Sequence, residues 1–139
     1  TGARLAEIAG LQAEDLREDR ILIRPNELRP LKTLSSERSI PIHPRLKALA
    51  EELRIKKGLL WPGQYQESNK RWGVNLSKPC RKIVGATPKG FRDRAATVLR
   101  FNNMNEAVVV ALLGHTPNSI SMSYGAVPWS ELKRAVKLL

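Results

Sequence analysis

The stretch from residue 20 to residue 42 differs in its residue pattern from the sequence on either side. "RILIRP" and "RSIPI" are rich in branched aliphatic residues, and Pro25-Asn26 and Ser35-Ser36 supply turn-forming residues between them. This pattern is typical of short strands joined by turns. "LKTL", which lies between the two segments, could form a third strand. The sequence therefore predicts a small three-stranded antiparallel sheet in the first third of the chain.

Helical patterns lie on both sides of this predicted sheet. The opening "TGARLAEIAG" has apolar residues at helical spacing and ends on Gly10, a residue type common just after a helix. After the sheet, "HPRLKALAEEL" begins with Pro44, which suits a first helical turn, and repeats leucines on one face. We therefore expect an α+β fold that is mostly α-helical, with helices around the small sheet.

The middle of the sequence is expected to form one loop, followed by one helix that a proline interrupts. Residues 54–70 contain glycine and proline but few periodic apolar residues, so they predict the loop. Helical spacing returns from Trp72 to Ile83. Pro79 is expected to kink or interrupt this helix, because proline cannot donate a backbone hydrogen bond.

Two Thr-Pro pairs indicate where later helices begin. Threonine caps a helix N-terminus and proline fits its first turn. Thr87-Pro88 therefore predicts a helix through "KGFRDRAATVLRF". Thr116-Pro117 predicts a second, short helix that reaches Tyr124.

Two further helices are expected in the last third of the chain. Residues 106–113 form an apolar segment that Gly114 closes. "PWSELKRAVKLL" is amphipathic and predicts a final helix. The apolar stripe of this helix consists of Trp129, Leu132, Val136 and Leu139.

Basic residues greatly outnumber acidic ones. The chain has 24 Lys and Arg against 13 Asp and Glu, a net charge of +11. Such a surplus favours a polyanionic partner, with nucleic acid as the first candidate. The cations are spread along the sequence rather than confined to one helix face, so a membrane surface is the weaker candidate.

Length, hydrophobicity and cysteine content indicate what class of protein this is. A chain of 139 residues fits one compact domain. No apolar run approaches the roughly 20 residues that span a bilayer, and the N-terminus lacks a signal-peptide pattern, so a soluble, cytoplasmic protein is expected. Cys80 is the only cysteine, which excludes an internal disulfide and a thiolate metal cluster.

Five short motifs occur in a particular order along the chain. They are "TGARLAEIAGLQAEDL", "LKTLSSERSIPIHP", "PKGFRDRAAT", "LLGH" and a tyrosine nine positions after that histidine. In type and spacing they resemble the catalytic domain of the tyrosine recombinases, the phage integrase family. His115 follows Arg92 by 23 positions (115 − 92), and Tyr124 follows His115 by 9 (124 − 115), both usual intervals for that family. The resemblance spans essentially the whole chain.

The resemblance implies a catalytic role for six residues. It also implies an acidic residue shortly after the first catalytic arginine, here Glu7 after Arg4. Lys89 occupies a position that is usually histidine, and Tyr124 corresponds to the nucleophile. The six residues are Arg4, Lys32, Lys89, Arg92, His115 and Tyr124.

The residue types fit metal-independent cleavage of a phosphodiester. The reaction needs a nucleophile, cations on the non-bridging oxygens and an acid for the leaving oxygen. The planar fork of an arginine suits a phosphate, a role for Arg4 and Arg92. A phenol is only about 0.1% ionised at neutral pH, so Tyr124 needs a neighbour to take its proton, for which His115 and Lys89 are candidates. Lys32 is the candidate acid.

The resemblance also implies the biological setting. It implies a DNA site-specific recombinase that works through a 3′-phosphotyrosine intermediate and needs no cofactor. Its partner is double-stranded DNA, on which it forms a homo-oligomer, a tetramer. The C-terminal helix 128–139 could pack on its own domain or be exchanged between protomers, and the resemblance favours the exchange. Residues 1–139 would be a single catalytic domain, a fragment without the N-terminal DNA-binding domain and the first catalytic-domain helices. Such a protein is encoded by a bacterium, phage or other mobile element and associates with the nucleoid.

Two other functions remain open at this point. A type IB topoisomerase relaxes DNA strands with the same side-chain chemistry, although the short intervals favour a recombinase. A basic DNA-binding module without catalysis would explain the charge alone. Each residue taken singly is also ordinary, since a lone arginine is usually a solvated surface residue.

Overall fold

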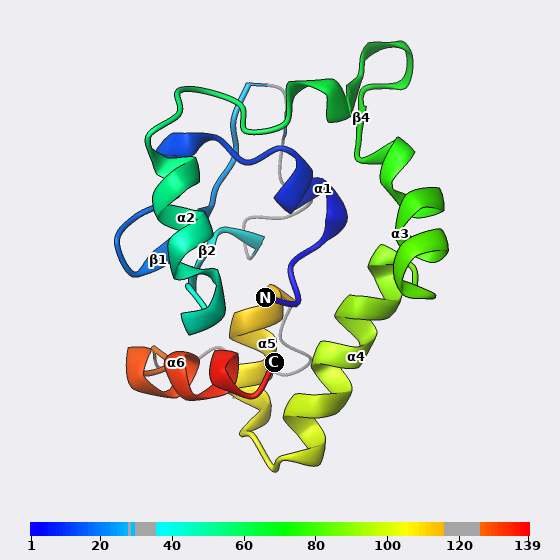
Figure 1. Cartoon of the computed structure of the whole chain (residues 1–139). Helices are drawn as coiled ribbons and strands as arrows, with labels where there is room; N and C mark the ends of the chain where they lie inside the picture. The colour runs from blue at the N-terminus through cyan, green and yellow to red at the C-terminus, as the bar shows by residue number, and fades with distance from the viewer. Residues whose placement is uncertain (28, 30–35, 116–125) are drawn as a thin grey trace.

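Short helices and two small antiparallel sheets make up the part of the chain that the computed structural model describes, residues 1–27, 29, 36–115 and 126–139 (Figure 1). The α-helices are α1 (Leu5–Ala9), α2 (Lys47–Arg54), α3 (Ser77–Val84), α4 (Pro88–Phe101), α5 (Glu106–Leu113) and α6 (Trp129–Lys137). The strands are β1 (Arg20–Ile23), β2 (Arg38–Pro41), β3 (Tyr65–Gln66) and β4 (Arg71–Trp72). The predicted α-rich α+β class is confirmed.

β1 and β2 form an antiparallel pair, in which Ile21 lies opposite Ile40 and Ile23 lies opposite Arg38. Burial alternates along β1, as expected for a strand with one face on the core. The predicted three-stranded sheet is not matched, because each described sheet has two strands. Residues 31–34, predicted as the third strand, lie outside the described residues.

α5 lies at the centre of the core. Its sequence is apolar on nearly every side, which is typical of a buried helix, and it contacts α4, α6 and β2. Val109, Leu112 and Leu113 are fully buried. The helix ends at Gly114, whose φ of +66° confirms the predicted glycine stop. Because α5 is buried, the carbonyls at its C-terminal end must find hydrogen-bond partners within the protein.

α4 begins at the predicted threonine cap. The Thr87 side chain accepts a hydrogen bond from the Gly90 N–H at 3.1 Å, and Pro88 is the first helical residue. Asn102 follows the last residue of the helix. The second Thr-Pro pair and the helix predicted to reach Tyr124 lie outside the described residues.

The hairpin of β3 and β4 departs most from the sequence prediction. The sequence predicts a loop over residues 54–70 and a helix from Trp72, whereas Tyr65 and Trp72 pair across the hairpin with ring centroids 4.9 Å apart. Strands of two residues are too short to carry an alternating pattern. α3 begins only at Ser77, so Pro79 falls in the first turn, where its missing N–H costs no intrahelical bond.

Gly10 follows the last residue of α1, as predicted, but the position does not need a glycine for a left-handed turn. Its φ of −97° is open to any residue, so no left-handed turn is involved. A Cβ atom at this position would instead lie 2.8 Å from Cδ of Arg29 and 3.2 Å from Cε2 of Trp72. Close packing therefore requires the glycine.

α6 packs on its own domain. Leu132, Ala135 and Val136 are buried, and the helix contacts α5 and β2. The Trp129 indole N–H donates to Oδ2 of Asp19 at 3.0 Å. The C-terminal helix therefore lies in cis in this single chain, and its exchange between protomers stays a prediction. Among the described residues, no helix combines the length and the apolar character needed to cross a lipid bilayer.

Candidate functional site

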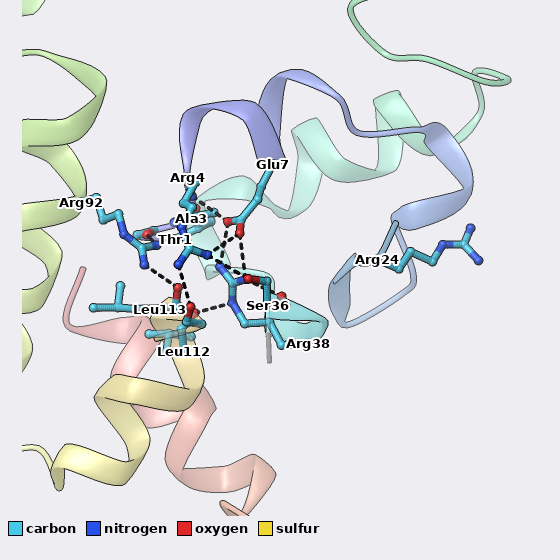
Figure 2. A network of polar contacts seen from close by, with 12 residues as sticks. Thr1, Ala3, Arg4, Glu7, Arg24, Ser36, Arg38, Arg92, Leu112 and Leu113 are labelled. Carbon is cyan, nitrogen blue, oxygen red and sulfur yellow. Dashed lines mark hydrogen bonds and ion pairs between the residues drawn. The ribbon is translucent and has the colours of Figure 1, made fainter. Parts of the chain in front are cut away.

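Three arginine side chains converge on the C-terminal end of α5 (Figure 2). Each donates to a different one of three successive backbone carbonyls. The bonds run from Arg38 Nε to Leu112 O at 2.9 Å, from Arg92 Nη2 to Leu113 O at 2.7 Å, and from Arg4 Nη2 to Gly114 O at 2.9 Å. Cations suit this position, because the carbonyls at a helix C-terminus carry a partial negative charge.

Arg4 is positioned by the start of α1. It is the N-cap residue, and its backbone N–H donates to Oε2 of Glu7 at 2.7 Å. Its side chain donates back to Oε1 of the same carboxylate at 2.9 Å. The Arg4 side chain is 32% exposed, so it reaches the surface while remaining fixed at both ends.

Glu7 is the carboxylate at the centre of the cluster. It is buried, and it also accepts hydrogen bonds from Arg38 at 3.1 Å and 2.9 Å. Burial alone would raise the pKa of Glu7, but the hydrogen bonds and charge of Arg38, followed by the bonds from Arg4, lower the pKa below its usual value. Two guanidinium groups, those of Arg4 and Arg38, therefore bind one carboxylate, and with Arg92 the cluster keeps a surplus of positive charge.

Arg92 comes from α4 and carries the most perturbed charge of the cluster. Its Nη1 donates to Gly2 O at 2.7 Å, in addition to the bond to Leu113. Burial lowers its pKa to about 10, and the charge of Arg4 contributes next. Arg92 remains charged at neutral pH. A bound anion would relieve both effects, because it would offset the cost of burying the cation and screen the neighbouring charge.

His115 follows directly after the three capped carbonyls. Gly114, in its left-handed conformation, turns the chain, and the backbone N–H of His115 donates to Val110 O at 3.1 Å. Burial lowers the pKa of His115, and the charges of Arg92 and then Arg4 lower it further. The imidazole is therefore neutral at pH 7 and able to accept a proton.

Lys89 lies at the outer edge of the same region. Its side chain is 82% exposed and forms an ion pair with Asp93 at 2.6 Å, one turn along α4. Such an exposed pair contributes little to stability. The lysine nevertheless borders an open pocket of about 350 Å³. The pocket is lined by Arg4, Leu5, Ser77, Thr87, Pro88, Lys89 and Arg92.

The structure thus brings together four of the six residues predicted from the sequence. Arg4 and Arg92 share the pocket with Lys89, and their charges act on His115. Lys32 and Tyr124 lie outside the described residues.

Arg38 was not predicted as a site residue, because it belongs to the segment "RSIPI", whose pattern predicts only a strand. The side chain of Arg38 is 7% exposed and contacts both Glu7 and α5. The available signal was a charged residue at the start of an otherwise apolar strand. That signal is weak, because strand ends often carry charges.

A second buried arginine lies behind the cluster. Arg29 donates to the backbone carbonyl of Glu7 and, at 2.7 Å, to that of Arg24. Its Nη2 lies 3.7 Å from Oδ2 of Asp15, which is also buried. Arg29 therefore supports the backbone of α1 from the interior side and lies apart from the pocket residues.

Comparisons with known proteins identify the fold. No protein-family model matches the sequence, and no curated protein matches it either. The solved structure of an integrase from mycobacterium phage Brujita is similar, with a TM-score of 0.70 and 16% sequence identity. The similarity covers 98% of this chain but 46% of that one, so the chain spans less than half the length of the integrase. At this identity the likeness shows the fold alone, and that fold is integrase-like.

Proposed function

We propose that this chain is the catalytic domain of a DNA site-specific recombinase of the tyrosine type. The observation that carries the proposal is the cluster of Arg4, Arg92 and Arg38 at the C-terminal end of α5, next to the neutral His115. The integrase-like fold supports a recombinase over a topoisomerase. The assembly, a DNA-bound tetramer that exchanges helix 128–139, and the association with the nucleoid belong to the same proposal.

The cluster suits a phosphodiester. A guanidinium has more N–H donors than the two that Arg92 uses on carbonyls, so donors remain to bind a phosphate oxygen while the side chain stays fixed. Arg4 borders the same pocket and can bind the second non-bridging oxygen. Charge-assisted bonds of this kind strengthen as negative charge develops on the phosphorane oxygens.

The proposed reaction conserves the energy of the phosphodiester. The phenol oxygen of Tyr124 attacks phosphorus, and its proton passes to His115. A bond forms from Tyr124 to phosphorus, the bond to the 5′-oxygen breaks, and Lys32 supplies the proton to that leaving oxygen. The products are a 3′-phosphotyrosine and a free 5′-hydroxyl. A 5′-hydroxyl from another strand can reverse the steps, which joins new partners.

The charge distribution favours DNA as the partner. Residues 70–100 contain nine Lys and Arg but one acidic residue, Asp93. Eight of the nine cations are exposed; Arg92 is the exception. This segment includes β4, α3 and most of α4, which follow one another along one edge of the molecule (Figure 1). An edge rich in exposed cations beside the pocket of Arg4 and Arg92 is expected to bind the nucleic-acid backbone. Lys89 belongs to this edge, and we assign it a phosphate contact at the pocket.

A covalent-adduct assay tests the proposed function. The protein is incubated in EDTA with a pool of labelled nicked duplexes of randomised sequence, because a nick lets the cleaved strand diffuse away and traps the phosphotyrosine. Wild type is expected to form an adduct that survives denaturing electrophoresis, and Tyr124→Phe is expected to form none. Tyr65→Phe is the matched control, since Tyr65 is the other tyrosine of the chain and lies in β3. An undiminished adduct in Tyr124→Phe would exclude Tyr124 as the nucleophile.

The role of Lys32 has a separate test. A substrate with sulfur in place of the 5′-bridging oxygen has a leaving group that departs without protonation. The adduct rate of Lys32→Ala should therefore be low on the oxygen substrate and close to the wild-type rate on the sulfur substrate. An equal defect on both substrates would remove Lys32 from the role of acid.

A further inference from the structure

Arg38 is a nearly buried arginine at the start of β2 that contacts the site without lining its pocket. Its side chain is 7% exposed. Besides the bond to Leu112 O, its Nη1 donates to Ser36 O at 2.8 Å. The pocket is lined by Arg4 and Arg92 but not by Arg38. Its guanidinium therefore faces other protein groups (Figure 2).

The Glu7 carboxylate joins Arg38 to Arg4. Oε1 of Glu7 accepts from Arg4 Nη1 at 2.9 Å and from Arg38 Nη1 at 3.1 Å. Oε2 accepts from the Arg4 backbone N–H at 2.7 Å and from Arg38 Nη2 at 2.9 Å. Each carboxylate oxygen thus has one bond from each arginine. The two hydrogen bonds from Arg38 fix the orientation of the Glu7 carboxylate plane. The carboxylate orientation in turn fixes where the Arg4 guanidinium is bound.

Arg38 also occupies the space beneath the turn that leads to His115. A Cβ atom on Gly114 would lie 2.5 Å from Nη1 of Arg38, closer than any real contact allows. The guanidinium therefore touches the Glu7 side chain on one side and the end of α5 on the other. Through these contacts it links the elements that carry Arg4 and His115.

We propose that Arg38 is a positioning residue, which holds Glu7 and the end of α5 so that Arg4 and His115 keep their places around the reacting phosphate. The inference rests on the proposed function, since it assigns a role within that reaction. Arg38 itself does not touch the phosphate. Its replacement should therefore slow strand cleavage while leaving the affinity for DNA unchanged.

The test compares Arg38→Gln with wild type in the adduct assay and in a DNA-binding assay. A misplacement of about 1 Å costs a reaction about a hundredfold in rate, so we expect a loss approaching that size, with a Kd for DNA within about twofold of wild type. Arg38→Lys keeps the charge but loses the planar fork, so it should show an intermediate rate. It serves as the test variant if the glutamine variant does not fold. Arg54→Gln, which replaces an exposed arginine at the end of α2, is the matched control and should change neither quantity.

A pH profile separates positioning from a purely structural role. Without Arg38, burial of Glu7 is opposed by fewer bonds, so the pKa of Glu7 rises, and the pKa of His115 rises too, because the charge of Arg38 also lowers it. The Arg38→Gln rate, corrected for the folded fraction, should therefore fall at a higher pH than the wild-type rate as the solution is acidified. A wild-type rate and an unshifted profile in Arg38→Gln would overturn the inference while leaving the proposed function intact. Absence of any adduct in wild type would instead remove the proposed function, and with it the reaction that Arg38 is inferred to serve.

Discussion

Arg29 is buried and Arg92 is partly buried, and both donate to backbone carbonyls, yet their surroundings differ. Burial lowers the pKa of both. Arg29 has Asp15 as a counter-ion inside the protein, whereas Arg92 borders an open pocket and is next opposed by the charge of Arg4. Within the described ranges, Arg92 forms no ion pair. Burial of an arginine therefore does not by itself indicate a binding site; a partly buried arginine that has no paired anion and borders an open pocket does.

The largest effect should be a loss of stability when the interior arginine, Arg29, is replaced. Arg29→Ala leaves the buried carboxylate of Asp15 without one of its cations, and we expect the free energy of unfolding to fall by about 3–5 kcal/mol. Urea unfolding measures the change. Arg24→Ala removes the other cation on Asp15, but this side chain is 40% exposed, so the loss should be much smaller. Equal losses would show that burial does not distinguish the two arginines.

The pocket arginine should affect activity instead. Arg92→Lys keeps the positive charge but cannot make two parallel bonds to a phosphate, so the adduct rate should fall about a hundredfold, equivalent to about 2.7 kcal/mol. The free energy of unfolding should change by no more than about 1 kcal/mol, since a charge remains beside the carbonyls of α5. A large loss of stability with an unchanged rate per folded molecule would place Arg92 in the same class as Arg29.

The neutral imidazole predicts how the rate depends on pH. Burial and the charges of Arg92 and Arg4 hold the pKa of His115 below 6.5. Because the neutral form accepts the phenol proton, the adduct rate should be constant above that value and fall about tenfold per pH unit below the lowered pKa. His115→Gln should react more slowly and lose this dependence. If the adduct rate of His115→Gln still falls at low pH, the fall must come from the protonation of another group.

The smallest effect concerns the basic edge. Lys78 and Arg81 are exposed on α3, and each phosphate contact contributes about 0.9 to the slope of log affinity against log salt concentration. Replacing both by glutamine should therefore reduce the slope by nearly 2. The matched control replaces Lys56 and Lys57, just beyond the end of α2. If the two pairs change the slope equally, DNA binding is not localised to the edge that α3 and α4 form.

Capping residues in the sequence correctly predicted where α4 begins and where α5 ends. Thr87 and Gly114 act on backbone groups within a few residues, so the sequence alone locates them. The β3–β4 hairpin was missed because two-residue strands have no period to detect. The predicted third strand around Lys32 remains a prediction, since it lies outside the described residues.

The candidate site was predictable only as an ordered set. The intervals between Arg4, Arg92 and His115 predicted that they act together, and the structure brings them to one end of α5. Arg38 could not be predicted in this way, because its partners Glu7 and Leu112 lie 31 and 74 residues away in sequence. Contacts of that range depend on how β2 packs against α1 and α5. No local pattern in the sequence encodes that packing.

The central claim is that Arg4 and Arg92, at the end of α5, bind a backbone phosphate. Nitrogen-15 NMR of the arginine Nε–H groups tests it directly, during titration of the intact chain with a short DNA duplex. The signals of Arg92 and Arg4 should shift as the duplex binds, while the signal of Arg29 should stay in place. Saturation of the protein with DNA while the signals of Arg92 and Arg4 remain unchanged would contradict it.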